Sequence, residues 1–123
     1  MQELVEIKIN DNENIIEAIQ KTMREKQAMV FVPVTASGSI KNIAISMIGK
    51  TCQLHKDLSG KTYEISSVSG KIHALTDGFL WDLSIVVRGN GTGAIHGSLK
   101  AATAAGPVSF VFRNVNLAQI RVA

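Results

Sequence analysis

The chain has 123 residues, of which 46% are hydrophobic, so it is not disordered and can build one ordinary domain, expected to span residues 1–123. Its 13 lysines and arginines against 10 aspartates and glutamates give a net charge of +3 and a pI near 9.2, too small an excess to identify a nucleic-acid-binding protein. No apolar run approaches the about 20 residues that a membrane-spanning helix needs, so we expect no membrane partner.

The first two predicted elements are a strand and a helix. Residues 4–9 alternate apolar and charged side chains, which predicts an edge or outer strand. Asn14 is followed three residues later by Glu17, the spacing of a helix N-cap with its reciprocal carboxylate. Apolar residues then recur at helical spacing up to about Lys26 and predict a stripe that packs on a sheet: Ile15, Ile16, Ile19 and Met23.

The next segment predicts two strands and a long loop. Residues 28–35 are apolar and β-branched, with Pro33 marking a bulge or a sheet edge. Residues 36–39 have turn chemistry, and alternation over residues 43–48 predicts a second strand. Residues 49–61 contain few apolar side chains and are expected to form an exposed loop of the kind that often carries function.

From Thr62 onward the sequence predicts almost only strands. The turns between them are short enough for antiparallel hairpins. One amphipathic helix on a mostly antiparallel sheet is an α+β architecture. The expected strands cover residues 63–68, 71–75, 79–88, 94–99 and 107–112, with turns at Ser69-Gly70, Asp77-Gly78, residues 89–93 and Ala105-Gly106.

The shortage of charge indicates self-association. Charged residues make up 19% of the chain, against about 25% in average proteins, and the mean hydropathy is +0.17. A small monomer exposes proportionally more surface than a large one, so we expect some of its apolar area to lie in a subunit interface. A hydrophobic monomer is the alternative.

The single cysteine indicates a reducing compartment. Cys52 cannot form an intramolecular disulfide, and an inert role for it is favoured over a reactive thiol because no base stands beside it. The first four residues have neither the basic nor the apolar region of a signal peptide. We therefore expect a cytoplasmic protein.

The sequence contains no motif for catalysis, a cofactor or a metal. The glycine-rich residues 89–93 lack the following helix of a phosphate-binding loop, so a hairpin connection is favoured. His55, His73 and His96 lie far apart in the sequence, which leaves only a zinc site assembled across the fold as an alternative to no metal. His73 is expected to be a partly buried, hydrogen-bonded side chain. A non-enzymatic binding role is therefore favoured, with no cofactor.

Glu64 stands inside a predicted strand, where a buried unpaired carboxylate would be costly. It either faces solvent or pairs with Arg88, with Lys61 or with a donor of a neighbouring subunit. Both interpretations agree with the rarity of buried, unpaired glutamates.

Residues 60–72, Gly-Lys-Thr-Tyr-Glu-Ile-Ser-Ser-Val-Ser-Gly-Lys-Ile, resemble the hallmark of the plant and prokaryote conserved (PPC) domain. That family carries Gly-Arg-Phe-Glu-Ile-Leu leading into Ser-Leu-Ser-Gly, and the order of predicted elements also agrees. The resemblance implies a compact α+β domain, PPC-like, that forms a homotrimer.

The chain departs from two further features of the family. Plant relatives bind AT-rich DNA largely through an Arg-Gly-Arg-Pro hook, which this sequence lacks. Many bacterial and archaeal relatives carry His-x-His and a later Gly-Gly-His-Leu, which look like a metal site near the subunit junction. Here Leu80-Trp81-Asp82 and His96-Gly97-Ser98-Leu99 stand in their places, which leaves Asp82 and His96 as too few ligands for a metal.

Two functions follow as expectations. The first is a homotrimeric DNA-binding or regulatory module that makes its contacts through Lys61, Tyr63, Glu64 and Ile65 and needs a basic patch of Lys56, Lys61 and Lys71. The second is a small-molecule-binding protein or enzyme with a site at the subunit interface, where the polar groups would be Asp82, Arg88 and His96. A purely structural oligomer would have neither patch nor pocket.

Overall fold

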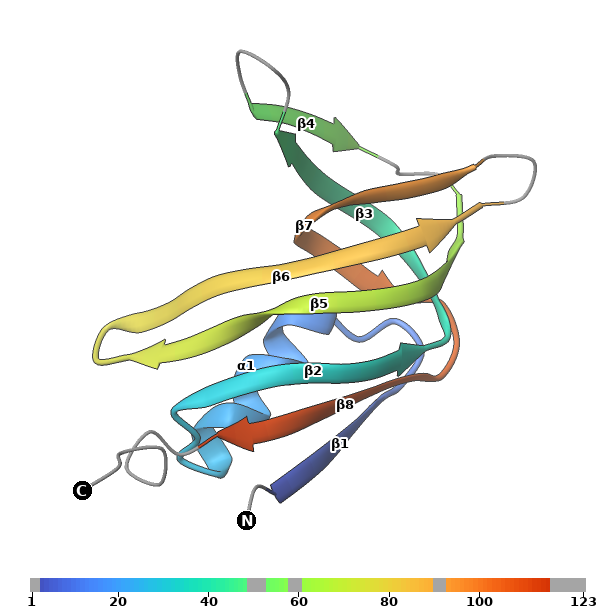
Figure 1. Cartoon of the computed structure of the whole chain (residues 1–123). Coiled ribbons are helices and arrows are strands. Elements are labelled where there is room, and N and C mark those ends of the chain that lie inside the picture. The colour runs from blue at the N-terminus through green and yellow to red at the C-terminus, as the bar shows by residue number, and fades with distance from the viewer. Residues whose placement is uncertain (1–2, 49–52, 58–60, 90–92, 116–123) are drawn as a thin grey trace.

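The computed structural model describes residues 3–48, 53–57, 61–89 and 93–115. These residues form one helix and eight strands (Figure 1). All pairings between the described strands are antiparallel, which confirms a mostly antiparallel sheet with one helix. The elements are β1 (Glu3–Ile9), α1 (Ile15–Glu25), β2 (Val30–Ser37), β3 (Ser39–Ile48), β4 (Gln53–Asp57), β5 (Tyr63–Leu75), β6 (Gly78–Arg88), β7 (Ala94–Ala104) and β8 (Val108–Val115).

The strands follow the order β1-β8-β2-β5-β6-β7-β3-β4, and β3 also pairs with β5. The second pairing of β3 closes β5, β6, β7 and β3 into a ring, and β2, β8 and β1 extend from the β5 side of it. β1 lies at one edge of the sheet, as its alternating sequence predicts.

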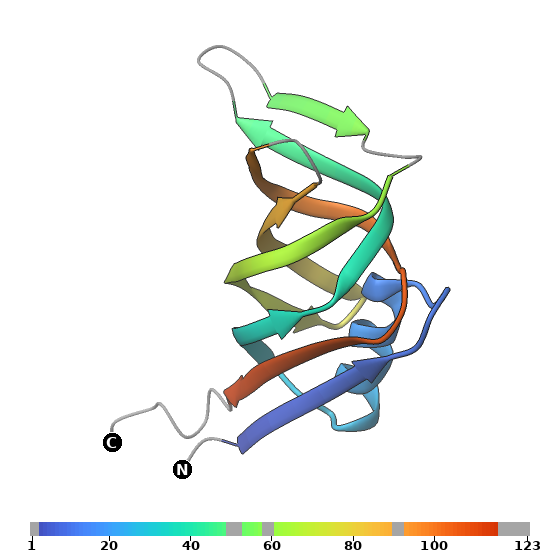
Figure 2. The ribbon, with the colours of Figure 1, turned by 90° about the vertical axis from the view of Figure 1, so that its right-hand side faces the viewer.

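Helix α1 packs against both β1 and β7, which have four other strands between them in the sheet. The sheet therefore curves around the helix, which Figure 2 shows on one side of the strands. The Asn14 side chain accepts a hydrogen bond of 3.0 Å from the Glu17 amide, so the predicted N-cap is confirmed. Ile15, Ile19 and Met23 of the predicted apolar stripe are fully buried.

The core between helix and sheet contains a column of aromatic rings. The ring of Phe112 stacks on Phe31 at a centroid distance of 5.1 Å and on Phe110 at 5.8 Å. These three side chains are fully buried and come from β2 and β8. Offset stacking of this kind adds about 0.5–1.5 kcal/mol per pair to the hydrophobic stabilisation.

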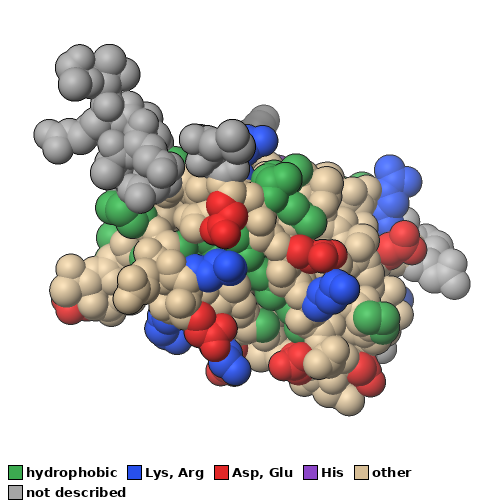
Figure 3. Space-filling model, turned by 90° about the horizontal axis from the view of Figure 1, so that it is seen from below, with side chains coloured by type: hydrophobic (Ala, Val, Ile, Leu, Met, Phe, Trp, Pro, Cys, Tyr) green, Lys and Arg blue, Asp and Glu red, His purple; other side chains and the backbone are tan. Residues whose placement is uncertain are grey.

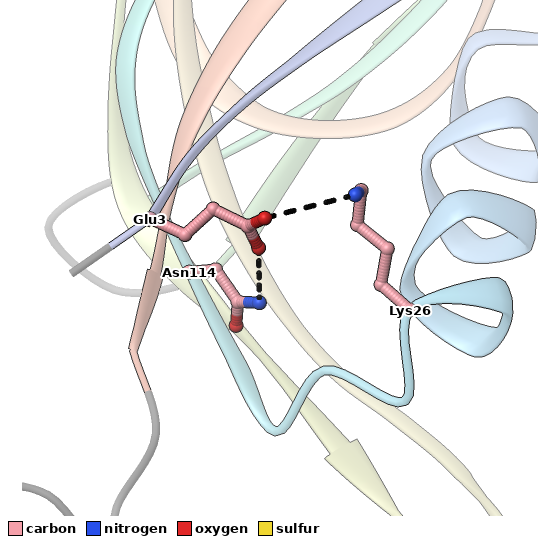
Figure 4. Close-up of polar contacts among 3 residues, drawn as sticks. All are labelled: Glu3, Lys26 and Asn114. Carbon is pink, nitrogen blue, oxygen red and sulfur yellow. Dashed lines mark hydrogen bonds and ion pairs between the residues drawn. The ribbon is translucent and has the colours of Figure 1, made fainter.

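Polar contacts at the chain's first strand join three elements (Figure 4). The Glu3 carboxylate accepts a hydrogen bond of 3.2 Å from the Asn114 amide of β8 and lies 4.0 Å from the Lys26 ammonium group, just after α1. Both charged side chains are largely exposed, so this ion pair contributes little to stability.

The predicted bulge at Pro33 is confirmed by a register shift between Pro33 and Thr35. β2 pairs with β5 only through Val30 and Phe31, so β2 has no β5 partner at Pro33. A proline there removes no ladder hydrogen bond on that side.

Three sequence expectations are wrong. Residues 53–57 form β4, which pairs with β3, where an exposed loop was expected. The turn predicted at Ser69-Gly70 is absent, since residues 63–68 and 71–75 belong to the single strand β5. β7 and β8 do not form a hairpin, because β8 lies between β1 and β2.

The predicted hairpins between β5 and β6 and between β6 and β7 are confirmed, because each pair of strands is antiparallel. The described part of the chain contains no helix that could span a lipid bilayer. Cys52 lies outside the described residues, as do Asn90, Gly91 and Thr92 of the glycine-rich segment.

Candidate functional site

A cavity of about 760 Å³ opens on the face of the sheet where β6 and β7 separate. Four strands of the closed ring contribute to its wall. Its lining consists of Ser46 from β3, Lys71 and His73 from β5, Leu80, Trp81, Asp82 and Ser84 from β6, and His96, Gly97, Ser98 and Lys100 from β7.

The cavity forms because the β6–β7 ladder stops at the pair Ser84–Ser98. Beyond this pair, β7 continues along β3 while β6 continues along β5. The Leu99 carbonyl, which faces the gap, accepts a hydrogen bond of 2.9 Å from the indole N–H of Trp81. The Trp81 indole thus takes the place of a β6 backbone amide as the donor to the Leu99 carbonyl, and β6 and β7 remain apart here.

A row of serines crosses the sheet beside this opening. Ser84 of β6 is paired with Ser69 of β5 and with Ser98 of β7, and Ser98 is paired in turn with Ser46 of β3. Residues directly opposite in an antiparallel pair share a face. Ser84 and Ser98 are half-buried, so their hydroxyls can still reach a ligand in the cavity.

Charged and titratable side chains flank the serine row. Lys71 lies directly opposite Asp82 in the β5–β6 register, and His73 follows Lys71 on the same face of β5. On β7, His96 precedes Ser98 and Lys100 follows it, again on one face. All five side chains line the one cavity, which therefore combines cationic, acidic and hydrogen-bonding groups.

The structure brings two of the three predicted pocket residues together. Asp82 and His96 line the same cavity, both exposed. Arg88 does not join them, because it lies at the far end of β6 and lines a second, smaller cavity of about 380 Å³.

The second cavity contains the residues of the hallmark segment. Glu64 of β5 is paired directly with Arg88 of β6, so the predicted partner lies on the neighbouring strand. Lys61 is exposed and immediately precedes this strand, whereas Tyr63 and Ile65 are only 5% exposed and belong to the core. In the single chain, direct contacts from this segment would therefore come from Lys61 and Glu64.

The basic patch expected from Lys56, Lys61 and Lys71 is not assembled within one chain. Lys61 and Lys71 lie ten residues apart along an extended segment, which separates them by about 30 Å. The side chain of Lys56 lies outside the described structure. On the face seen in Figure 3, acidic and basic side chains are interspersed, with no continuous basic area.

The residues of the large cavity do not fit a metal site. Asp82 and His96 are present, but across the described segments no group of three histidine, cysteine, aspartate or glutamate side chains could hold a metal ion. Lys71 and Lys100 line the same cavity, and their ammonium groups repel a cation.

Sequence reasoning missed Trp81, Lys100 and Ser84 as members of the site. For Ser84 and Lys100 the available signal was the alternation along β6 and β7, which places residues 80, 82 and 84, and 96, 98 and 100, on common faces. Trp81 alternates to the opposite face of β6, so this pattern gave no signal for it. The alternation does not reveal where the two strands separate, so it could not locate the cavity.

A sequence profile of the Plants and Prokaryotes Conserved (PCC) domain matches residues 2–116. Among solved structures, a candidate DNA-binding protein from Bacteroides thetaiotaomicron has a TM-score of 0.80 at 20% identity, covering 94% of this chain and 84% of its own. A PPC protein from Pyrococcus horikoshii has a TM-score of 0.77 at 14% identity, and the match covers 94% of this chain and 83% of the Pyrococcus chain. A metal-containing protein from Archaeoglobus fulgidus has a TM-score of 0.75 at 17% identity, and the match covers 90% of this chain and 79% of the Archaeoglobus chain.

At these identities the three structures establish a shared fold. No curated protein matches the sequence.

Proposed function

This chain belongs to the Plants and Prokaryotes Conserved (PCC) domain family, and from that premise we propose that it is a homotrimeric binding module whose ligand site is the cavity between β6 and β7. The PPC resemblance of residues 60–72 is thereby confirmed. One observation carries the proposal: Asp82, His96 and two lysines from three different strands converge on one cavity of about 760 Å³. A large pocket with a few convergent polar groups is the usual form of a small-molecule site.

Self-association is supported by the apolar side chains that a single chain leaves in water. Leu80 is 56% exposed at the edge of the cavity. A neighbouring copy that covered this region would remove apolar area from water and would turn the open cavity into an enclosed interface site. Among the residues whose side chains the structure describes, the other large exposed hydrophobic ones are Leu4, Met29, Val34 and Leu75.

We further propose that residues 1–123 form one domain and that the protein works in the cytoplasm. The second part of this proposal rests on the single cysteine, which suits a reducing compartment.

The assembly and the site are tested separately. Mass measurement of the purified protein under native conditions should give three times the 13.2 kDa of one chain, and a single-chain mass would overturn the trimer. A thermal-shift screen of small metabolites should give hits whose rise in melting temperature is reduced in His96→Ala and Asp82→Ala. Hits unaffected by both substitutions would place binding elsewhere and overturn the site.

DNA binding is the second candidate, favoured because two of the structures that share the fold come from candidate DNA-binding proteins. In this function Lys61 and Glu64 would lie in the contact region, and Tyr63 and Ile65 would hold them in place. Affinity for a mixed DNA pool should fall steeply as salt is raised, because phosphate contacts release counterions. Absent or salt-insensitive binding would remove this candidate.

A further inference from the structure

We propose that the cavity between β6 and β7 binds a small organic anion, with its anionic group between Lys71 and Lys100 and its apolar part against Trp81 and Leu80. This inference rests on the proposed function, since it names the ligand class of the same site. The anionic group would be a carboxylate or a phosphate monoester, both of which accept hydrogen bonds from ammonium and hydroxyl groups.

The charge of the lining favours an anion. Lys71 comes from β5 and Lys100 from β7, so the two ammonium groups approach the cavity from opposite sides. Asp82 is the only carboxylate among the lining residues, which leaves one positive charge in excess. Within the described part of the chain, Glu3 and Lys26 form the only ion pair within 4.0 Å. Neither cavity lysine is therefore held by a described carboxylate, and both are available to a ligand.

Neutral donors surround the position between the lysines. Ser84 and Ser98 are directly paired and half-buried, and each hydroxyl can donate one hydrogen bond to an oxyanion. The imidazoles of His73 and His96 add ring N–H donors on either side of the serine row. Such donors satisfy an anion's lone pairs without the need for a metal ion.

The remaining lining residues suit an apolar group. The Trp81 indole N–H is already donated to the Leu99 carbonyl at 2.9 Å, so what this half-buried side chain offers a ligand is its ring. Leu80 adds aliphatic surface on the face of β6 that also carries Asp82, and it is 56% exposed. A ligand with a planar or aliphatic part would cover this surface and exclude water from it.

Trp81 is the only tryptophan of the chain, so its fluorescence reports directly on the cavity. We would titrate the native protein with three probes that share one ring and differ in charge: benzoate, benzyl alcohol and benzylamine. Benzoate should change the fluorescence saturably and bind at least about fivefold more tightly than benzyl alcohol, and benzylamine should bind most weakly. Phenyl phosphate, titrated in parallel, would show which of the two anionic groups the site prefers.

Variants locate the effect. Lys71→Ala and Lys100→Ala should each weaken benzoate binding at least about fivefold and leave benzyl alcohol unchanged, while Lys100→Arg should retain binding. Lys8→Ala is the matched control, because Lys8 is an exposed lysine on β1 that does not line the cavity. Unfolding temperatures of all variants would be measured to exclude loss of fold.

The outcomes separate the inference from the proposed function. Equal binding of the three probes, or benzoate binding that survives both lysine substitutions, would overturn the anion inference while leaving a small-molecule site in place. A Trp81 signal that responds to none of the four probes overturns the anion inference. If the thermal-shift screen also finds no ligand that depends on Asp82 or His96, the cavity's proposed function falls as well.

Discussion

The indole N–H of Trp81 in β6 donates a hydrogen bond of 2.9 Å to the backbone carbonyl of Leu99 in β7. The two residues lie just beyond the last paired residues of these strands, Ser84 and Ser98. A backbone carbonyl freed from a ladder needs another donor, and here a partly buried side chain supplies it. This contact connects the sheet's topology to the existence of the cavity.

We predict that Trp81→Phe destabilises the protein by about 2 kcal/mol. The substitution removes the indole N–H that donates to the Leu99 carbonyl and part of the ring that packs against the core. Urea unfolding followed by circular dichroism would measure the change, since the variant has no tryptophan fluorescence.

Leu75→Ala is the control for this measurement. Leu75 lies in the β5–β6 hairpin, is 56% exposed and does not line the cavity, so its truncation should change stability by no more than about 0.5 kcal/mol. Comparable losses in the two variants would contradict a specific role for the indole hydrogen bond.

Gly70→Ala should be strongly destabilising, by at least about 2 kcal/mol more than Gly106→Ala. Both glycines have a φ of +98°, so both substitutions place an L side chain in the left-handed region. A Cβ at position 70 would lie 2.0 Å from the backbone oxygen of Asp82, whereas a Cβ at position 106 would meet nothing within 4 Å. The difference in unfolding free energy therefore isolates the close approach of β5 to β6. Equal effects would show that the strands can separate at little cost.

Gly70 also explains why one expectation from the sequence is wrong. Ser69-Gly70 has the composition of a turn, but the positive φ of the glycine serves a close strand approach inside β5. Local composition does not distinguish these two uses of glycine. Residues 53–57 present a similar problem, because this polar segment becomes β4 through pairing with β3, a long-range contact.

The helix and the edge strand could be predicted because their signals are local. Alternation over residues 4–9 and the Asn14 cap with its apolar stripe depend only on neighbouring residues. Only part of the candidate site could be predicted from the sequence. Asp82 and His96 were found through the family resemblance, but their shared cavity depends on where β6 and β7 separate.

We predict that Asn14→Ala lowers the free energy of unfolding by about 1 kcal/mol. The Asn14 side chain accepts the Glu17 amide at 3.0 Å, and alanine leaves that amide without its cap. Asn14→Asp and Asn14→Ser keep an acceptor at this position and should retain most of the stability. Thermal or urea unfolding would measure all three variants, and a loss as large in Asn14→Ser as in Asn14→Ala would argue against capping as the cause.

The last prediction concerns assembly. If neighbouring copies cover the sheet face that carries the cavity, Leu80→Glu should place a carboxylate in the interface and shift the trimer towards single chains. Leu4→Glu is the matched control, since Leu4 is 61% exposed on the edge strand β1 and does not line the cavity. Light scattering coupled to size-exclusion chromatography over a dilution series would report the mass of each variant. Dissociation by Leu4→Glu but not by Leu80→Glu would move the interface to the β1 edge of the sheet, and the cavity would then open to solvent in every subunit.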